Sequence, residues 1–521
     1  MRSLRFVLLP ALILAARSVS AQDVAGAYNF SNLTVQGTAR SMGFGNALGS
    51  VGGDFSSLSV NPAGLGIYRS SEFTFTPSLR INSASSNYAG SNTLDNNTHF
   101  NINNFGLVFT SAPKGKRYER RSWKAVSFAI GMNRVADFNR QYNYQGVNKT
   151  SSGSQAFESD ANMNPGNANL SNPNSSLGYM GYSSYLLNQD PVSGSFYSIV
   201  PFAGGVNQLK SVRENGGINE YTISLGGNYK EKLMLGITIG IPGVNYHRYY
   251  YYSESLSSDN NSNNPYGFQS FNYNQSVDIT GVGINAKIGA IYKFSDFFRI
   301  GTAFHSPTYY SLSDYSSPGI TTVHNDSLVE LSGDNGYLPT NQFDYHLNTP
   351  WKGLISATFI IKKFGFITAD YEYVDYKSMR YTYPNGFEPE ENAMNQEIKK
   401  SFQGVSNFRL GAEARIKKVF MVRIGGGYYG NAYTGYGEAN NLSYTTQRID
   451  INGGLGFHFR HFFTDLGFVH SMYQGMQQPY SIVYNDGSGR NYVWSGAPVA
   501  VPKAKIDYSL NNVALTVGVK F

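Results

Sequence analysis

Apolar and polar residues alternate along most of the chain after about residue 70, with the period of two that is typical of a β-strand. The C-terminus shows this most clearly. One face there carries Val513, Leu515, Val517, Val519 and Phe521, and the other carries Ala514, Thr516, Gly518 and Lys520. Residues 233–241 and 282–292 repeat the pattern. A strand with one apolar and one polar face suits a wall between lipid and water.

Fourteen segments of this kind are expected. They are 71–81, 98–112, 123–145, 218–229, 232–252, 268–293, 297–311, 341–361, 364–380, 404–417, 419–432, 444–459, 461–473 and 507–521. The connections between them alternate between short and long. Outer-membrane barrels have an even strand number, short periplasmic turns and longer external loops. The pattern therefore predicts an all-β fold, a 14-stranded antiparallel transmembrane β-barrel over residues 71–521 with long extracellular loops and with both chain termini in the periplasm.

The composition agrees with a membrane barrel. Charged residues make up 14% of the chain, against about 25% in an ordinary soluble domain. Gly (56), Tyr (40) and Phe (34) are abundant. A soluble β-sandwich would also alternate, but it has no need for so many aromatic residues at strand ends. After the first twenty residues no run of about 18 apolar residues occurs, which excludes a bundle of transmembrane helices. The absence of cysteine excludes disulfides, Cys-based zinc sites and thiol catalysis.

The N-terminus has the features of a secretory signal peptide. Arg2 and Arg5 precede an apolar stretch, 6–16, and Val19-Ser20-Ala21 supplies small residues for cleavage. We therefore assign residues 1–21 to a signal peptide and expect the mature protein in the outer membrane. Its small, dispersed basic surplus does not indicate a nucleic-acid partner. The basic connection at 113–122 either attracts anionic lipid headgroups or is a solvated turn.

Residues 22–70 do not alternate, and they are too few for two spanning strands together with their own turn. They are rich in glycine and alanine and lead through Asp54 into Asn61-Pro62-Ala63-Gly64-Leu65. The lumen of a fourteen-strand barrel is wide enough to hold them as a plug. In that position Pro62 would fix a turn, and the Asn61 side chain would hydrogen-bond the local backbone.

The motif from Gly37-Thr38-Ala39-Arg40 to Asn61-Pro62-Ala63-Gly64-Leu65, ahead of fourteen strands, resembles the FadL-type outer-membrane transporters of hydrophobic compounds. The resemblance implies that residues 22–70 form a hatch and that hydrophobic small molecules enter passively. It also implies that ligand leaves sideways through a wall opening at a kink in the third strand. Barrels of this kind commonly end in an aromatic residue, here Phe521, and their other partners are the barrel assembly machinery and outer-membrane lipid.

The third predicted strand, 123–145, loses its alternation after Met132. The residues that interrupt it are Gly131, Asn133, Arg134 and Asp137. Interrupted pairing is typical of a bulge or kink, so these residues are the candidates for the wall opening. Alternatively, they mark only the outer end of the membrane-spanning part.

The longest predicted loop, about 146–217, contains a cluster of large apolar residues. Its candidate ligand-capture residues are Leu177, Met180, Leu186, Leu187, Phe196 and Phe202. Exposed apolar patches of this kind commonly bind a ligand, a protein partner or a membrane. Alternatively, these residues pack the loop onto the barrel.

Other functions receive less support. Gly425–Gly430 formally matches a dinucleotide-binding pattern, but it lies within a predicted strand and opens no helix, so no enzyme activity, metal or cofactor is expected. His247, among the tyrosines at 246 and 249–252, is the one cluster that suggests a haem receptor, although an aromatic girdle explains it better. A platform that docks a secretion or surface-attachment partner, and a general porin, also remain as alternatives.

Overall fold

The computed structural model describes residues 24–113, 115–163, 165–169, 176–260, 262–333, 338–416, 419–434, 447–482, 484–485, 491–492 and 501–521. The predicted signal peptide at 1–21 lies outside the described residues. Lys114, Lys417 and Lys418 of the predicted short turns also lie outside them.

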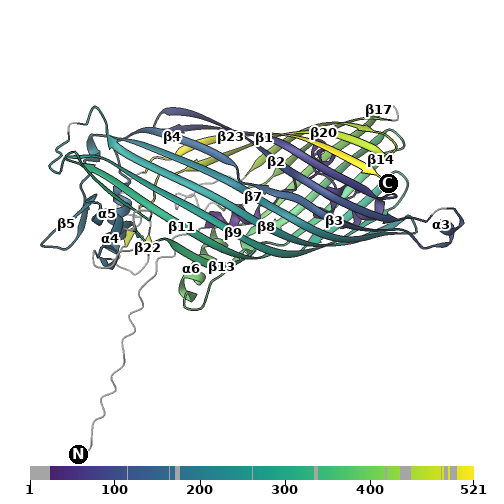
Figure 1. Cartoon of the computed structure of the whole chain (residues 1–521), viewed down its shortest axis with the longest axis horizontal. Helices are drawn as coiled ribbons and strands as arrows, with labels where there is room; N and C mark the ends of the chain where they lie inside the picture. The colour runs from purple at the N-terminus through teal and green to yellow at the C-terminus, as the bar shows by residue number, and fades with distance from the viewer. Residues whose placement is uncertain are drawn as a thin grey trace, which may run out of the picture.

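A single antiparallel sheet closes on itself to form the barrel (Figure 1). Four of its fourteen strands are each made of two consecutive segments. In chain order the strands are β1 (Glu72–Tyr88), β2 (Ser91–Ser111), β3 (Trp123–Asp137) with β4 (Arg140–Asn148), β7 (Val206–Tyr229), β8 (Leu233–Leu256), β9 (Phe268–Lys293), β10 (Phe298–His305) with β11 (Tyr309–His324), β13 (Asn341–Asn348) with β14 (Lys352–Ile361), β15 (Gly365–Asp375) with β16 (Arg380–Thr382), β17 (Gly404–Ile416), β18 (Phe420–Tyr429), β19 (Arg448–His458), β20 (Phe462–Gln477) and β23 (Ala504–Lys520).

The first and last strands complete the ring. β1 pairs with β23 from Glu72 opposite Lys520 to Asn87 opposite Lys505. At the short-turn end, the Ser71 and Phe521 backbones exchange hydrogen bonds of 3.1 and 3.0 Å. Closure joins the first strand to the last, as a β-structure that crosses hydrocarbon requires. The prediction of a 14-stranded antiparallel barrel is confirmed.

The outer ends of several strands extend further than predicted. A long loop was expected between 81 and 98, but β1 and β2 continue and meet at a tight turn through Ala89 (φ 47°) and Gly90 (φ 83°). β7 likewise begins at Val206 rather than near 218. Where a strand projects beyond the lipid, both of its faces meet water or loops. The apolar alternation that reveals a spanning strand is then lost.

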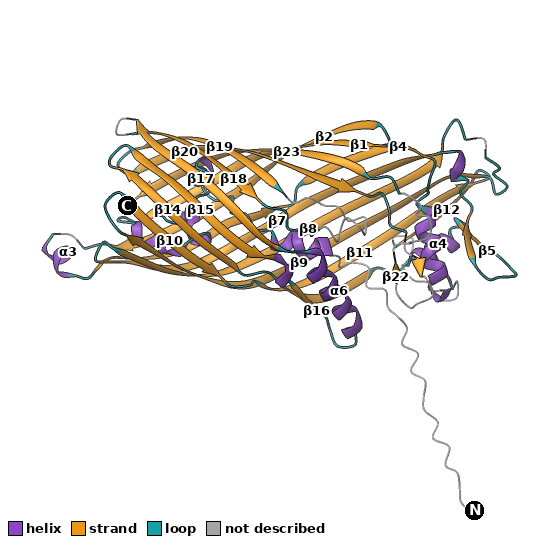
Figure 2. Ribbon diagram, turned by 180° about the vertical axis from the view of Figure 1, so that it is seen from behind, coloured by secondary structure: helices purple, strands orange, loops and turns teal. Residues whose placement is uncertain are grey.

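The two ends of the barrel differ (Figures 1 and 2). α3 (Lys116–Arg120) projects with the C-terminus at the short-turn end. The other end carries α4 (Ser154–Met163), η3 (Pro165–Ala168), α5 (Leu177–Ser183), β5 (Leu187–Gln189), β6 (Phe196–Ser198), η4 (Phe202–Gly204), β12 (Ser327–Ser332), β21 (Tyr484–Asn485) and β22 (Asn491–Tyr492). η5 (Tyr376–Ser378) and α6 (Glu388–Ser401) lie between β15 and β17. Among the described residues, no helix combines the length and the apolar character needed to span a bilayer.

The N-terminal residues 24–69, which we call the plug segment, lie in the lumen. They form α1 (Val24–Ser31), α2 (Ala39–Gly43), η1 (Phe55–Ser59) and η2 (Pro62–Ile67). α2 contacts β18, β19, β20 and β23, whereas η2 contacts β3, β7, β8 and β9 on the opposite wall. The segment therefore crosses the barrel interior. Its action as a movable hatch stays a prediction.

The closed ladder predicts resistance to unfolding in detergent. We expect a β-dominated circular dichroism spectrum and faster gel migration of the unheated protein than of the same sample after boiling. A mainly helical spectrum, or identical migration of the two samples, would contradict the fold.

Candidate functional site

The plug segment approaches the barrel wall where the strands carry glycine. A Cβ atom at Gly236 would lie 2.2 Å from the Pro62 carbonyl oxygen, and one at Gly301 would lie 2.1 Å from the Gly49 carbonyl oxygen. Three further wall glycines face plug backbone equally closely: Gly411, Gly425 and Gly467. Any side chain at these positions would push the plug away, because packed interiors leave no room for an added methyl group.

Gly131 belongs to this set of contacts. The Phe55 ring is fully buried against a pair of glycines, since Cβ atoms at Gly106 and Gly131 would lie 2.2 and 2.5 Å from its atoms. Gly131 itself is paired regularly, with Gly106 on β2 and Thr222 on β7. Gly131 therefore does not interrupt the third strand, contrary to the expectation from the sequence. It provides space for an aromatic side chain of the plug.

The predicted hatch motif lies at the contact between plug and wall. The Asn61 side chain caps η2 by accepting from the Ala63 backbone N–H at 3.1 Å, which is the local bond expected from the sequence. It also donates to the carbonyl oxygens of Gly49 (2.6 Å), Ala290 (3.3 Å) and Thr302 (3.2 Å). The last two belong to β9 and β10. One amide therefore joins two turns of the plug to the barrel wall.

The rest of the motif is buried around Asn61. Pro62 occupies the first turn of η2, and Ala63 packs against Met234 and Ile291 of the wall. Gly64 accepts a hydrogen bond from the Gly53 N–H at 3.1 Å.

Asp54 caps η1 and holds the plug together. Its carboxylate accepts from the Ser56 N–H at 2.9 Å and from the Thr38 hydroxyl at 2.8 Å. It also lies 3.7 Å from the Arg40 guanidinium.

An ion-pair network fastens the plug to the wall. Arg40 contacts Glu413 of β17 at 3.1 Å, and Arg423 of β18 contacts the same carboxylate at 2.8 Å. Arg423 also contacts Asp465 of β20 at 2.6 Å. All four side chains are largely buried, and breaking a buried pair leaves an uncompensated charge. The sequence analysis noted Arg40 in its motif but had no means of finding these partners on distant strands.

The ladder between β2 and the third strand stops at one point. Asn104 of β2 and Asn133 of β3 are the last paired residues, and β2 continues outward to Ser91 without a backbone partner on that side. A register shift between Arg134 and Ala136 places a bulge at Val135. β4 then pairs with β7 alone. We call this unpaired stretch, between 91–103 of β2 and 134–148, the seam.

Side chains bridge the seam in place of the backbone ladder. Asp137 accepts from Asn101 of β2 at 2.7 Å, lies 3.2 Å from the His99 ring nitrogen, and pairs with Arg134 at 3.0 Å. Further out, Asp95 of β2 accepts from the Asn143 backbone N–H at 2.7 Å. Of the predicted kink residues, Asn133, Arg134 and Asp137 thus lie at the start of the seam. Its use as an exit stays a prediction.

The plug also contacts the seam. The Thr34 N–H donates to the Val135 carbonyl at 2.8 Å, and the Gln36 N–H donates to the Arg134 carbonyl at 2.9 Å. Short extended backbone of the plug therefore supplies partners to the wall just where β2 ceases to pair. Buried backbone groups need such partners, so plug position and seam geometry are linked by direct hydrogen bonds.

A lumenal chamber of about 590 Å³ lies on the long-loop side of the plug and reaches the seam. The α1 residue Phe30 stacks edge-on against Phe138 at the seam (5.8 Å) and against Tyr246 (5.9 Å). Five cationic and three acidic residues share its lining, namely Arg80, Arg140, Lys210, Arg248, Arg448, Asp137, Glu214 and Asp450. The chamber thus combines aromatic surface with a surplus of positive charge.

The candidate capture residues of the long loop are packed inward. Met180, Leu186, Leu187 and Phe196 are buried, and Leu177 and Phe202 are partly buried, in a cluster with Phe268 and Phe271 of β9. This arrangement favours the alternative that these residues pack the loop onto the barrel. Ligand capture by them stays a prediction.

The residues considered for other chemistry are placed in the wall. Residues Gly425 to Tyr429 of this pattern form the last part of β18, and Gly430 follows the strand. The pattern does not begin a helix. His247 is exposed and lies 2.6 Å from Asp278 on the neighbouring strand. Within the described residues, no group of three or more His, Asp or Glu side chains is arranged to hold a metal ion.

No protein-family model and no curated protein matches the sequence. Among solved structures, a Pseudomonas aeruginosa FadL homologue is similar over 94% of this chain and 98% of its own, with 11% identity and a TM-score of 0.51. The chain has a FadL-type barrel fold. The Pseudomonas putida toluene transporter TodX gives 10% identity over 94% of this chain and 100% of its own, with a TM-score of 0.48. The Ralstonia pickettii toluene transporter TbuX gives 13% identity over 92% of this chain and 99% of its own, with a TM-score of 0.44.

The glycine contacts of this FadL-type fold predict that Gly236→Val displaces the plug from β8. Its Cβ would collide with the Pro62 carbonyl, so overpacking of about 1–3 kcal/mol opposes docking. We expect higher ion conductance in planar bilayers than for the parent, approaching that of a variant lacking residues 22–60.

Gly453→Val is the matched control, because a Cβ at Gly453 meets nothing within 4 Å. Equal conductance of all these proteins, each correctly folded, would show that the plug segment does not block the lumen.

Proposed function

We propose that this protein is a passive outer-membrane channel for the uptake of hydrophobic compounds. The observation that carries the proposal is the chamber that opens onto the seam while the plug segment fills the lumen below it. A ligand in the chamber is blocked from the straight route through the barrel. The unpaired stretch of wall beside it is the nearest way out.

The seam suits lateral exit for a physical reason. Parting two fully paired strands would leave a row of backbone groups unsatisfied in lipid, at several kcal/mol each. Along the seam β2 and β4 share no backbone hydrogen bonds, so parting them breaks the side-chain bridges of Asp137 and Asp95. It also disturbs the packing of Tyr144 of β4 against Tyr88 of β1, whose ring centroids are 5.0 Å apart. An apolar ligand then passes into the membrane without entering water. Burial of its apolar surface, at roughly 25 cal/mol per Å², drives its loading from the outside.

The plug segment acts as the hatch in this scheme. Its hydrogen bonds from Thr34 and Gln36 hold the bulged carbonyls of the third strand. Movement of the segment would free those carbonyls and loosen the seam. The fold similarity to a FadL homologue agrees with this proposal, and no energy source is required.

The charges of the chamber favour a ligand with an anionic end group, such as a long-chain fatty acid. Three lining cations are matched by acids: Arg140 bonds Glu214, Arg448 lies 3.0 Å from Asp450, and Arg80 lies 3.8 Å from Asp137. Lys210 has no carboxylate partner within the described part of the chain. It donates to the Gln478 carbonyl at 2.7 Å and lies 4.9 Å from the Tyr250 ring centroid. A ligand carboxylate beside Lys210 would supply the missing countercharge.

Crosslinking the seam tests the exit route. The chain has no cysteine, so Asp95→Cys with Asn143→Cys introduces the sole thiol pair. After treatment with a short bis-maleimide, we expect uptake of palmitate by intact cells to fall to the level of cells lacking the protein, while binding to the purified protein persists.

The matched control is Ile449→Cys with Met472→Cys, a pair of exposed residues that face each other on β19 and β20. The same reagent should leave its uptake unchanged. Undiminished uptake through the crosslinked seam would disprove lateral exit at this place.

Replacement of Lys210 tests the ligand class. Lys210→Met should weaken palmitate binding by at least about tenfold, since a hydrogen bond to a charged group contributes about 1.5–3 kcal/mol. Binding of hexadecanol, which lacks the charge, should be unchanged, and Lys210→Arg should retain palmitate. Calorimetric titration in detergent gives all three affinities. Equal losses for the two ligands would show that Lys210 only packs the chamber.

A further inference from the structure

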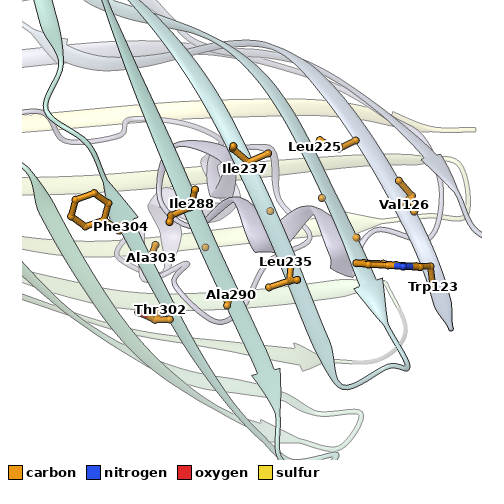
Figure 3. A pocket seen from close by; sticks show the side chains of 14 residues that line it. Trp123, Val126, Leu225, Leu235, Ile237, Ile288, Ala290, Thr302, Ala303 and Phe304 are labelled. Carbon is orange, nitrogen blue, oxygen red and sulfur yellow. The ribbon is translucent and has the colours of Figure 1, made fainter.

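The outer face of β3 and β7–β10 carries a hollow of about 710 Å³, on the side of the wall opposite the hatch motif (Figure 3). Successive strand residues point to opposite faces. Gly236 and Gly289 turn inward against the plug, so Leu235, Ile237, Ile288 and Ala290 turn outward. Figure 3 shows these outward side chains on the wall, with the plug behind it.

The hollow follows from one row in which three of the five residues are small. The cross-strand register aligns Val126, Gly227, Leu235, Ala290 and Thr302 in a line across five strands, and only Leu235 among them is as large as the residues of the two neighbouring rows. The neighbouring row on the long-loop side contains only large residues: Phe128, Leu225, Ile237, Ile288 and Phe304. The line toward the short turns is also large: Trp123, Tyr229, Leu233, Tyr292 and Ile300. At about 4.8 Å between strands, the row spans on the order of 20 Å. Leu235 stands in its middle, and the groove is open beside it over Ala290 and Thr302.

The depth of the groove in the membrane follows from its neighbours. Trp123, Tyr229 and Tyr292 form an aromatic row at the short-turn end, and such rows mark the interface between hydrocarbon and headgroups. The groove lies one row deeper. It is therefore within reach of a lipid whose headgroup sits at the periplasmic surface.

Basic residues cluster beyond the aromatic row. Arg120 and Arg121 are separated from Trp123 by Ser122 alone, and Lys230 and Lys232 belong to the neighbouring β7–β8 turn. The two turns touch, because the Lys230 N–H donates to the Ser122 carbonyl at 2.7 Å. Two of the nearby acids are already engaged: Glu231 lies 3.0 Å from Arg69, and Asp296 lies 2.6 Å from Lys293. Glu119 of α3 is the third acid nearby, and four cations outnumber it. Within the described residues, none of the four cations forms an ion pair.

We propose that this groove and the basic turns above it form a binding site for an anionic phospholipid of the inner leaflet. An acyl chain fills the groove over Ala290 and Thr302, and the phosphate contacts Arg121 and Lys232. The inference rests on the proposed membrane location and not on the transported ligand. Lipid binding and hydrocarbon uptake can therefore fail separately.

The test is native mass spectrometry of delipidated protein titrated with phosphatidylglycerol and, separately, with phosphatidylethanolamine. We expect one phosphatidylglycerol to bind more tightly than any phosphatidylethanolamine. Ala290→Phe, which fills the groove, should abolish this preferred site. Gly453→Phe, which adds the same ring at an open outward position on β19, should not.

The headgroup is tested by Arg121→Ser with Lys232→Ser. Each cation near a membrane surface contributes about fivefold to the affinity, so the double variant should bind phosphatidylglycerol about 25-fold more weakly. Lys362→Ser with Lys363→Ser removes two cations from another short turn and should have no effect.

Folding of every variant is checked by heat-dependent gel migration, and Ala290→Leu replaces Ala290→Phe if the latter does not fold. Equal binding by the groove variant and the Gly453→Phe control would overturn the acyl-chain site. Equal affinity for the two lipids, or no loss in the Arg121/Lys232 variant, would overturn the headgroup assignment.

Discussion

Backbone hydrogen bonding in hydrocarbon is the constraint on which the rest of this structure depends. Every strand must be paired on both sides, which forces the sheet to close from β1 to β23. The seam is where pairing stops, and its polar groups find other partners there. Val135 and Arg134 offer their carbonyls to the plug, while Asp137 gathers Asn101 and His99 across the gap. The interrupted pairing of the wall is thus compatible with the membrane because the lumen holds a segment that supplies hydrogen bonds.

Filling the lumen imposes the second condition, on the inner face of the wall. A plug of about fifty residues reaches opposite strands only if its backbone comes close to theirs. Gly236 and Gly301 permit this by having no Cβ, and Phe55 is accommodated by the facing pair Gly106 and Gly131. Because these contacts are distributed around the barrel, the plug is held by shape as well as by the Arg40 and Asn61 side chains. Shape complementarity of this kind stabilises the segment in the position seen here.

Much of the barrel could be predicted from its sequence, and much of the site could not. Alternation at 513–521 and 233–241 identified spanning strands, because one face of each meets lipid. The strand ends beyond the lipid, such as 82–88 of β1, carry no such signal and looked like loop. Gly131 was noticed as an interruption of apolar alternation, but its partner Phe55 is 76 positions away in sequence. The ion pair of Arg40 with Glu413 and the packing of the loop residue Leu186 against the barrel join residues that are far apart in the sequence. Local sequence patterns carry no information about such contacts.

Small residues in these strands have two meanings, which the inner and outer faces separate. Gly236 and Ala290 lie on adjacent paired strands, yet the first admits the Pro62 carbonyl from inside and the second deepens the outer groove. The wall between them is a single layer of backbone. At this place the hatch motif and the lipid-facing groove share β8, β9 and β10, since Asn61 bonds the very Ala290 and Thr302 whose outward faces line the groove. A substitution on either face therefore affects strands that contact both the plug and the groove. Because successive residues of a strand point to opposite faces, the position of the substituted residue determines whether its side chain contacts the plug or lines the groove.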